Sequence, residues 1–97
     1  MPRNEKLTRV IGGRTVQQAT AEPGKLVIRF DDQSTMTVKT AGIADVFPPG
    51  GKIKAVQEDG AKFTLHVEDG SIVTLPLADP GASVTVRDKN NKVEYLG

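Results

Sequence analysis

His66 and Glu68 are the residues of this sequence whose types and spacing come nearest to acid–base chemistry. His66 is the only histidine in the chain. Residues two apart in a strand lie on the same face, so a carboxylate at this spacing could orient the imidazole as a general base. No residue pattern in the sequence indicates that a nucleophile lies beside this pair. We therefore interpret His66 as a solvated strand residue and predict no catalytic residue.

Paired acids in two turn segments, Asp31-Asp32 and Glu68-Asp69, are a second candidate. If the turns faced each other, four carboxylates could converge for glycoside chemistry or to hold a hard cation. Acids are also favoured in turns because short polar side chains bond to their own backbone, and the ligand spacing of a calcium loop is missing. The chain has no cysteine, which excludes thiolate metal sites. We predict no metal, no cofactor and no enzymatic activity.

Two glycine pairs are each followed by a basic residue, in Gly12-Gly13-Arg14 and Gly50-Gly51-Lys52. Glycine-rich backbone can cradle phosphate, but the spacing of a P-loop is absent. We interpret both segments as turns that enter strands.

Residues 48–56, PPGGKIKAV, resemble the glycine-then-strand core of KOW-type SH3-like modules, which are associated with ribosomes and transcription. The resemblance implies weak, salt-sensitive phosphate contacts by Lys52, Lys54 and Lys62. A nucleic-acid-binding module of this kind would need its basic residues gathered on one surface, namely Arg14, Lys25, Lys52, Lys54 and Lys62.

Three apolar residues, Val27, Ile72 and Pro76, fall on the faces of strands that the alternation assigns to solvent. An exposed apolar patch of this kind marks a contact with a protein partner or a second copy of the chain. Cover by the N-terminal segment or by the last hairpin is the alternative.

The elements that would position these residues occur as two similar hairpins, Lys25–Val38 and Lys62–Leu75. Each alternates apolar and polar residues around a short polar turn, as a half-buried strand pair does. Their alignment at an offset of 37 predicts an internal repeat over residues 7–41 and 43–78. An odd number of loop residues is needed to keep both strands on one face, so we expect a three-residue loop or a bulge, with Phe30 opposite Met36.

Residues outside the hairpins predict shorter elements. Leu7, Val10 and Ile11 have helical spacing, although an edge strand is the alternative, and the same spacing at 43–47 predicts a helical turn. Residues 14–22 read as a strand, and 83–96 as a third hairpin that closes the sheet or covers an edge. We expect one all-β domain, 1–97, of about eight short antiparallel strands in a small barrel or sandwich, of which an SH3-like barrel is one form.

Charge and hydropathy restrict the partners. The net charge is +1, from 13 basic and 12 acidic residues, so no global field attracts nucleic acid or anionic lipid. Neither a signal peptide nor a membrane span is expected from the apolar runs, and we expect a cytoplasmic protein. The sequence predicts a non-enzymatic β-module that binds a protein partner or forms a homo-oligomer, with a nucleic-acid-binding KOW-type module as the alternative.

Overall fold

Eight strands and one short helix form the part of the chain that the computed structural model describes, residues 5–42, 50–79 and 83–97. The helix precedes all the strands, and antiparallel pairing of consecutive strands occurs within β1–β3, β4–β6 and β7–β8. Their bounds are α1 (Glu5–Ile11), β1 (Val16–Glu22), β2 (Lys25–Phe30), β3 (Thr35–Lys39), β4 (Ile53–Asp59), β5 (Lys62–Val67), β6 (Ile72–Pro76), β7 (Val84–Arg87) and β8 (Val93–Leu96).

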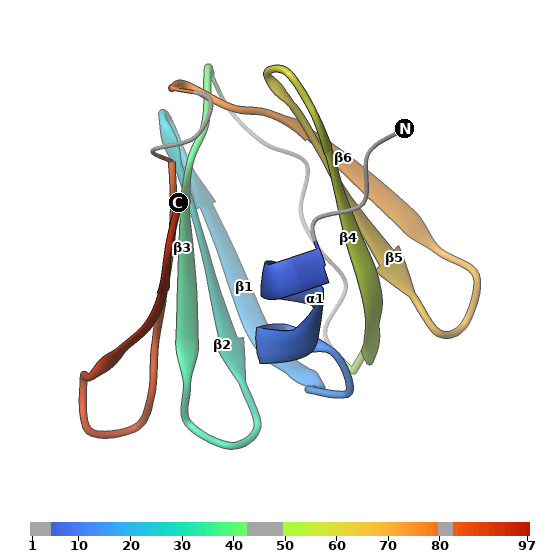
Figure 1. Cartoon of the computed structure of the whole chain (residues 1–97), viewed down its shortest axis with the longest axis vertical. Helices are drawn as coiled ribbons and strands as arrows, with labels where there is room; N and C mark the ends of the chain where they lie inside the picture. The colour runs from blue at the N-terminus through green and yellow to red at the C-terminus, as the bar shows by residue number, and fades with distance from the viewer. Residues whose placement is uncertain (1–4, 43–49, 80–82) are drawn as a thin grey trace.

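The strands form two antiparallel sheets rather than one closed barrel. The first sheet has the order β1-β2-β3-β7-β8, and the second has the order β4-β5-β6. Isolated bridges connect Thr15 with Lys52 and Thr40 with Leu77. Figure 1 shows the larger sheet on the left and the smaller on the right, with α1 in front of the space between them. The prediction of an all-β fold of antiparallel strands is confirmed. The prediction left a barrel and a sandwich as alternatives, and the described residues form no closed barrel.

The core lies between the sheets, and strands such as β2 and β3 turn alternate residues inward toward it. In β2, Leu26, Ile28 and Phe30 are fully buried, whereas Val27 and Arg29 are not. β5 buries Phe63 and Leu65 in the same way, although Thr64 between them is buried as well. The side chains of both sheets and of α1 join one buried apolar cluster, so neither sheet buries its apolar face alone.

A three-residue loop, Asp31–Gln33, joins β2 to β3, as predicted. The Phe30 N–H donates to the Ser34 carbonyl at 2.9 Å, and Gln33 has a φ of 71°. The predicted pairing was wrong by two residues, because Met36 lies opposite Ile28 rather than Phe30. Placing Phe30 opposite Met36 would need a five-residue loop, whereas a left-handed residue at 33 closes the shorter one.

The second sheet follows the first three strands at a constant offset. β4, β5 and β6 each begin and end 37 residues after β1, β2 and β3. The bulge between Val16 and Gln18 has its counterpart between Ile53 and Ala55. Hydrogen bonds between the halves are reciprocal too: Gly13 N–H donates to Ile53 O, and Gly50 N–H donates to Val16 O. The two meanders are therefore arranged about an approximate two-fold axis.

The N-terminal segment is the helix α1, not an edge strand. Leu7 and Ile11 are buried in the core. The hydroxyl of Thr8 accepts a hydrogen bond from the Val56 N–H at 2.9 Å, so the helix satisfies a backbone donor at the edge of β4. The helical turn expected at 43–47 lies outside the described residues.

The third hairpin extends the first sheet and covers the edge of β3. Covering an edge is one of the two roles predicted for it. β7 pairs with β3, with Thr85 opposite Thr37. Asn91, in its turn, has a φ of 66°, a conformation that asparagine tolerates better than most residues. Among the described residues β6 has no such neighbour, and it remains the edge of the second sheet.

Candidate interaction surface

His66 is held by an amide rather than by a carboxylate. Its Nε2 lies 2.9 Å from Oε1 of Gln57, which follows from the neighbouring register positions on β4 and β5. Glu68 instead lies 3.8 Å from the ammonium of Lys52. The alternative in which Glu68 orients His66 as a general base is therefore not supported, because the imidazole Nε2 contacts the Gln57 amide.

The acids of the two turns stabilise those turns. The Asp32 carboxylate accepts from the Ser34 N–H at 2.9 Å and from its hydroxyl, and Asp69 accepts from the Ser71 N–H at 2.8 Å. The Ser71 N–H lowers the pKa of Asp69. Partial burial acts to raise the pKa of Asp32, but the Ser34 hydrogen bonds and the Arg14 charge outweigh it and lower this pKa. No group of three or more metal-ligating side chains forms within the described residues.

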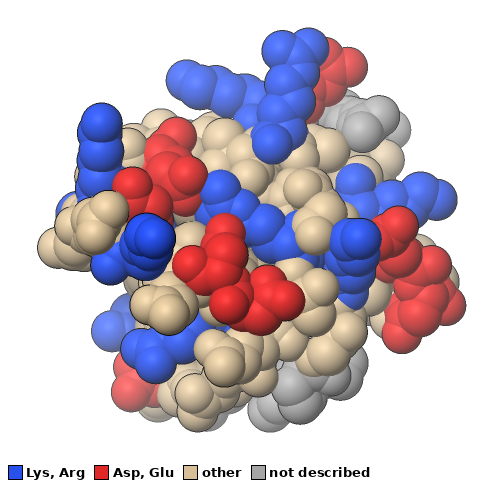
Figure 2. All heavy atoms as spheres, turned by 90° about the horizontal axis from the view of Figure 1, so that it is seen from below, with Lys and Arg blue, Asp and Glu red and all other residues tan. Residues whose placement is uncertain are grey.

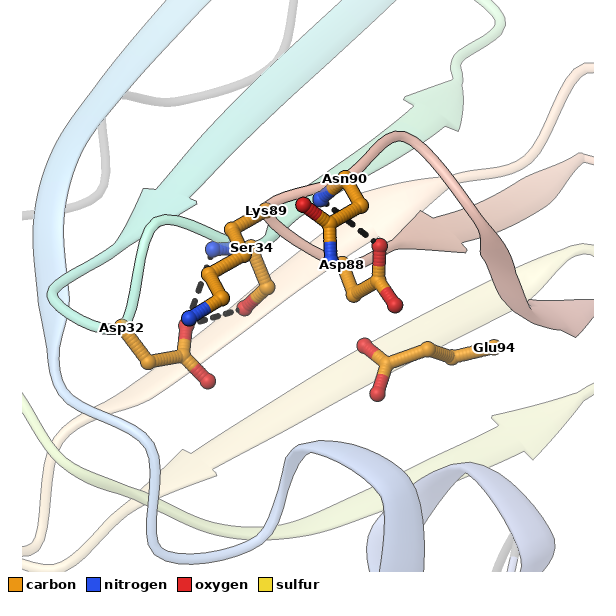
Figure 3. Close-up of a pocket in the computed structure, with 6 residues that line it drawn as sticks. All are labelled: Asp32, Ser34, Asp88, Lys89, Asn90 and Glu94. Atoms are coloured by element: carbon orange, nitrogen blue, oxygen red, sulfur yellow. Dashed lines mark hydrogen bonds between the residues drawn. The ribbon is translucent and has the colours of Figure 1, made fainter.

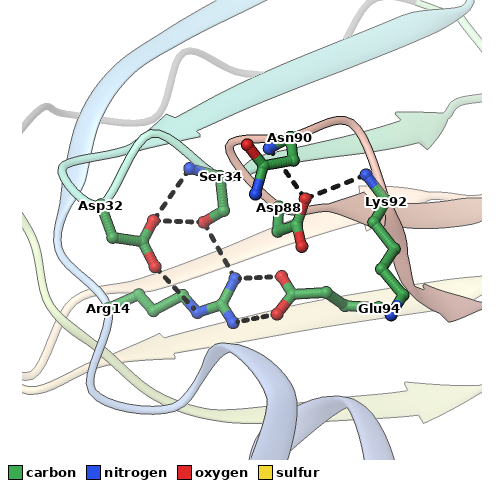
Figure 4. Close-up of polar contacts among 7 residues, drawn as sticks. All are labelled: Arg14, Asp32, Ser34, Asp88, Asn90, Lys92 and Glu94. Atoms are coloured by element: carbon green, nitrogen blue, oxygen red, sulfur yellow. Dashed lines mark hydrogen bonds and ion pairs between the residues drawn. The ribbon is translucent and has the colours of Figure 1, made fainter.

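Arg14, which precedes β1, contacts both the β2–β3 turn and β8 of the first sheet. Its guanidinium donates to both oxygens of Glu94 at 2.9 and 3.0 Å and to the Ser34 hydroxyl at 2.9 Å, and it lies 3.5 Å from Asp32. Figure 4 shows these contacts converging from the β2–β3 turn and from β8. The hydrogen bond to Glu94 raises the pKa of Arg14. The guanidinium nitrogens already contact Ser34, Glu94 and Asp32, so this arginine is a poor phosphate ligand.

A shallow cavity of about 290 Å³ lies beside this cluster, and Asp32, Asp88 and Glu94 are among its lining residues. Figure 3 shows their carboxylates around the hollow. Asp88 accepts hydrogen bonds from the N–H groups of Asn90 and Lys92, both at 2.9 Å. Each of the three carboxylates already stabilises a turn or the guanidinium, so the cavity offers no carboxylate without a partner.

The basic residues of the nucleic-acid alternative are distributed over both ends of the strands. Arg14 precedes β1 and Lys52 precedes β4, whereas Lys25 and Lys62 lie at the far ends of the same hairpins. Lys25 is 3.6 Å from Glu22. Lys54 lies in β4, two residues after Lys52. Figure 2 shows basic and acidic side chains interleaved over one end of the molecule.

The three apolar residues of the predicted patch lie on different sheets. Val27 is half-buried at the outer face of the first sheet, whereas Ile72 and Pro76 are exposed on β6 in the second. Ile72 has 61% of its surface exposed. Only Ile72 and Pro76 thus share an element.

β6 is the feature that the sequence reasoning missed, because the residues alone do not show which strand lacks a neighbour. It is an edge strand, and it contains no charged residue, whereas each other edge strand contains at least one. These charged residues include Glu22 in β1, Lys54 in β4 and Glu94 in β8. Natural edge strands oppose pairing with another chain by charges, by proline or by short length; β6 is five residues long and ends in Pro76, but it carries no charge.

The β5 side chains on the outer face beside β6 include one lysine, Lys62, which lies opposite Pro76 at the end of the strand. On β5, Thr64 lies opposite Thr74 and His66 opposite Ile72. The Thr64 hydroxyl is buried and has no hydrogen-bond partner among the described residues. A shallow, largely apolar hollow of about 470 Å³ lies at the end of this face, next to Pro76, Thr74 and Lys62. The surface is therefore one that a strand could cover at little electrostatic cost.

Comparison of the chain with protein-family models, with curated proteins and with solved structures finds no match. The single helix of the described residues is too short to cross a membrane.

Proposed function

We propose that this protein is a non-enzymatic β-module that binds an extended protein segment as an additional strand on β6. The observation that carries the proposal is the edge itself: β6 is uncharged, exposes Ile72 and has a neighbour on one side only within the described residues. Strand addition to a sheet edge supplies affinity through backbone hydrogen bonds and specificity through alternate side chains.

The first sheet provides a template for this contact. β3, which corresponds to β6 at the offset of 37, accepts β7 in an antiparallel register. We infer that the two meanders arose by internal duplication, with the third hairpin occupying only one of two related edges. An SH3-like or KOW-type relationship remains a prediction from residues 48–56.

The protein-binding proposal ranks above the nucleic-acid alternative on charge. Arg14 is bonded to Glu94, and Lys25 and Lys52 each lie near a carboxylate. The two lysine pairs are about half exposed and weak, but all three contacts offset the local positive charge that phosphate would need.

A titration followed by NMR amide shifts tests the proposed function. The probe is a synthetic peptide of residues 83–97, which contains the strand that β3 accepts. We expect shifts centred on Ile72 and Thr74. The shifts should be weaker when the peptide carries Thr85→Pro, because proline removes the N–H of the residue that would lie opposite Thr74, as Thr85 lies opposite Thr37 in the first sheet. An absence of shifts on β6 up to millimolar peptide would refute strand addition there. Shifts by a random-sequence RNA oligonucleotide at Lys52, Lys54 and Lys62, fading with salt, would favour the alternative.

A further inference from the structure

The backbone groups of β6 that face outward belong to Ile72 and Thr74. The Val67 N–H donates to Ser71 O, and the Leu77 N–H donates to Ala61 O, so the odd-numbered residues of this strand face β5. Antiparallel neighbours alternate between bonded and non-bonded pairs. The N–H and C=O groups of the even-numbered residues therefore point away from the sheet. In β3, the Lys39 N–H at the position corresponding to Pro76 donates outward to Ser83 O.

Pro76 limits the outward-facing groups to a short segment. Proline has no N–H, and the Pro76 carbonyl already accepts from the Ala41 N–H at 2.9 Å. Ile72 and Thr74 thus each offer one donor and one acceptor, two residues apart. A pair of identical antiparallel strands satisfies all of these groups when Ile72 of one copy lies opposite Thr74 of the other, because each such pair exchanges two hydrogen bonds.

This arrangement places Val73 on the two-fold axis, opposite itself. Val73 is half-buried and packs against the core, and a β-branched pair fits the close spacing of a non-bonded position. Centring the strands on Thr74 instead would set Ile72 against Pro76, which cannot donate. Hydrogen-bond matching therefore selects the register centred on Val73.

Charge also permits self-pairing. Residues 71–77, SIVTLPL, contain no ionisable side chain, so no like charges meet across the axis. The exposed Ile72 would gain the Thr74 methyl group of the second copy as its neighbour. The pairing of two five-residue strands buries far less than the roughly 800 Å² per partner of a stable interface, so the association is weak and reversible.

We propose that the partner of β6 is a second copy of this chain, joined β6 to β6 across a two-fold axis at Val73 into a continuous six-stranded sheet. The inference rests on the proposed function, because it names the occupant of the same edge.

Single cysteines introduced into this cysteine-free chain test the register. Val73→Cys should form a disulfide-linked dimer under mild oxidation, because non-bonded antiparallel pairs bring their Cβ atoms close to disulfide distance. Thr74→Cys and Ser71→Cys are matched controls, since the register places them opposite Ile72 and Leu75 of the second copy. Crosslinking at Thr74 in preference to Val73 would overturn the proposed axis.

Sedimentation equilibrium of the unmodified chain tests the association itself. We expect a monomer in dilute solution and a growing dimer fraction toward millimolar concentration. Thr74→Pro should abolish the dimer while Thr74→Ser retains it. Ile72→Lys, at an exposed position that does not threaten folding, should weaken it several-fold by bringing two ammonium groups together diagonally. A monomer at all concentrations would refute self-pairing. If the 83–97 peptide still shifts β6, the proposed function survives; if it does not, both fail.

Discussion

At the scale of single residues, Arg14 makes the densest set of polar contacts. A double-mutant cycle with Arg14→Ala and Glu94→Ala should give a coupling free energy of roughly 1 kcal/mol or more, because the bidentate pair is charge-assisted and largely buried at the arginine. Urea unfolding of the four proteins measures it. The pair of Lys52 and Glu68, at 3.8 Å and about half exposed on both sides, is the control and should couple by less than about 0.5 kcal/mol. Equal coupling in both cycles would contradict the assigned role.

The lowered pKa of Asp32 has a consequence for stability in acid. A group whose folded pKa is depressed binds fewer protons in the folded state, so its stabilisation is present above the ordinary carboxyl pKa of 3.8 and is lost as the pH falls through the folded value. Asp32→Asn should therefore be less stable than the parent at neutral pH, and the difference should shrink in acid. Urea midpoints across this range measure it. A difference that grows on acidification would contradict the assignment.

At the scale of elements, the β2–β3 and β5–β6 turns allow reciprocal substitutions at a pair of corresponding positions. Gln33 holds a φ of 71°, and its counterpart Gly70 holds a φ of 96° with no atom within 4 Å of an added Cβ. Gln33→Gly should stabilise the fold by about 0.5–1 kcal/mol, because glycine adopts left-handed backbone without strain. Gly70→Gln should destabilise it by a similar amount. Thermal unfolding of both variants measures the changes, and the same sign in both would contradict the backbone argument.

The contact of α1 with β4 depends on one hydroxyl. Thr8→Val should destabilise the protein by about 1–3 kcal/mol, because it leaves the buried Val56 N–H without its acceptor. Thr8→Ser keeps the hydroxyl and should cost less. The free energy of unfolding and the exchange rate of the Val56 amide both report this change. An unchanged Val56 exchange rate in Thr8→Val would show that the hydroxyl does not protect the strand edge.

The sequence was sufficient for local elements and insufficient for pairing. The alternation of Leu26, Ile28 and Phe30 and the acids of the turns predicted the hairpins, because both signals act over a few residues. The predicted pairing of Phe30 with Met36 was wrong by two residues, because that pairing requires five loop residues whereas the left-handed Gln33 closes a loop of three. The partner of His66 could not be predicted either, since Gln57 reaches it diagonally across the β4–β5 pair, and the residues alone do not show that register.

At the scale of the whole molecule, the chain is two matched meanders with an addition to one of them. The third hairpin covers β3, and nothing in the described residues covers β6 in the same way. Which edge stays open follows from the assembly of both sheets, so residues 72–76 read in isolation predicted only an exposed Ile72 and Pro76. The asymmetry between the halves is the reason for proposing that β6 accepts an additional strand.

Amide hydrogen exchange of β6, read residue by residue by NMR, tests this assignment most directly. In dilute solution we predict fast exchange at Ile72 and Thr74, whose N–H groups face outward, and slow exchange at Val73 and Leu75, which are bonded to β5. Concentrating the protein, or adding the 83–97 peptide, should slow Ile72 and Thr74 and leave the other two unchanged. Protection of Ile72 and Thr74 already in the dilute monomer would mean that the edge is closed, and would contradict the account.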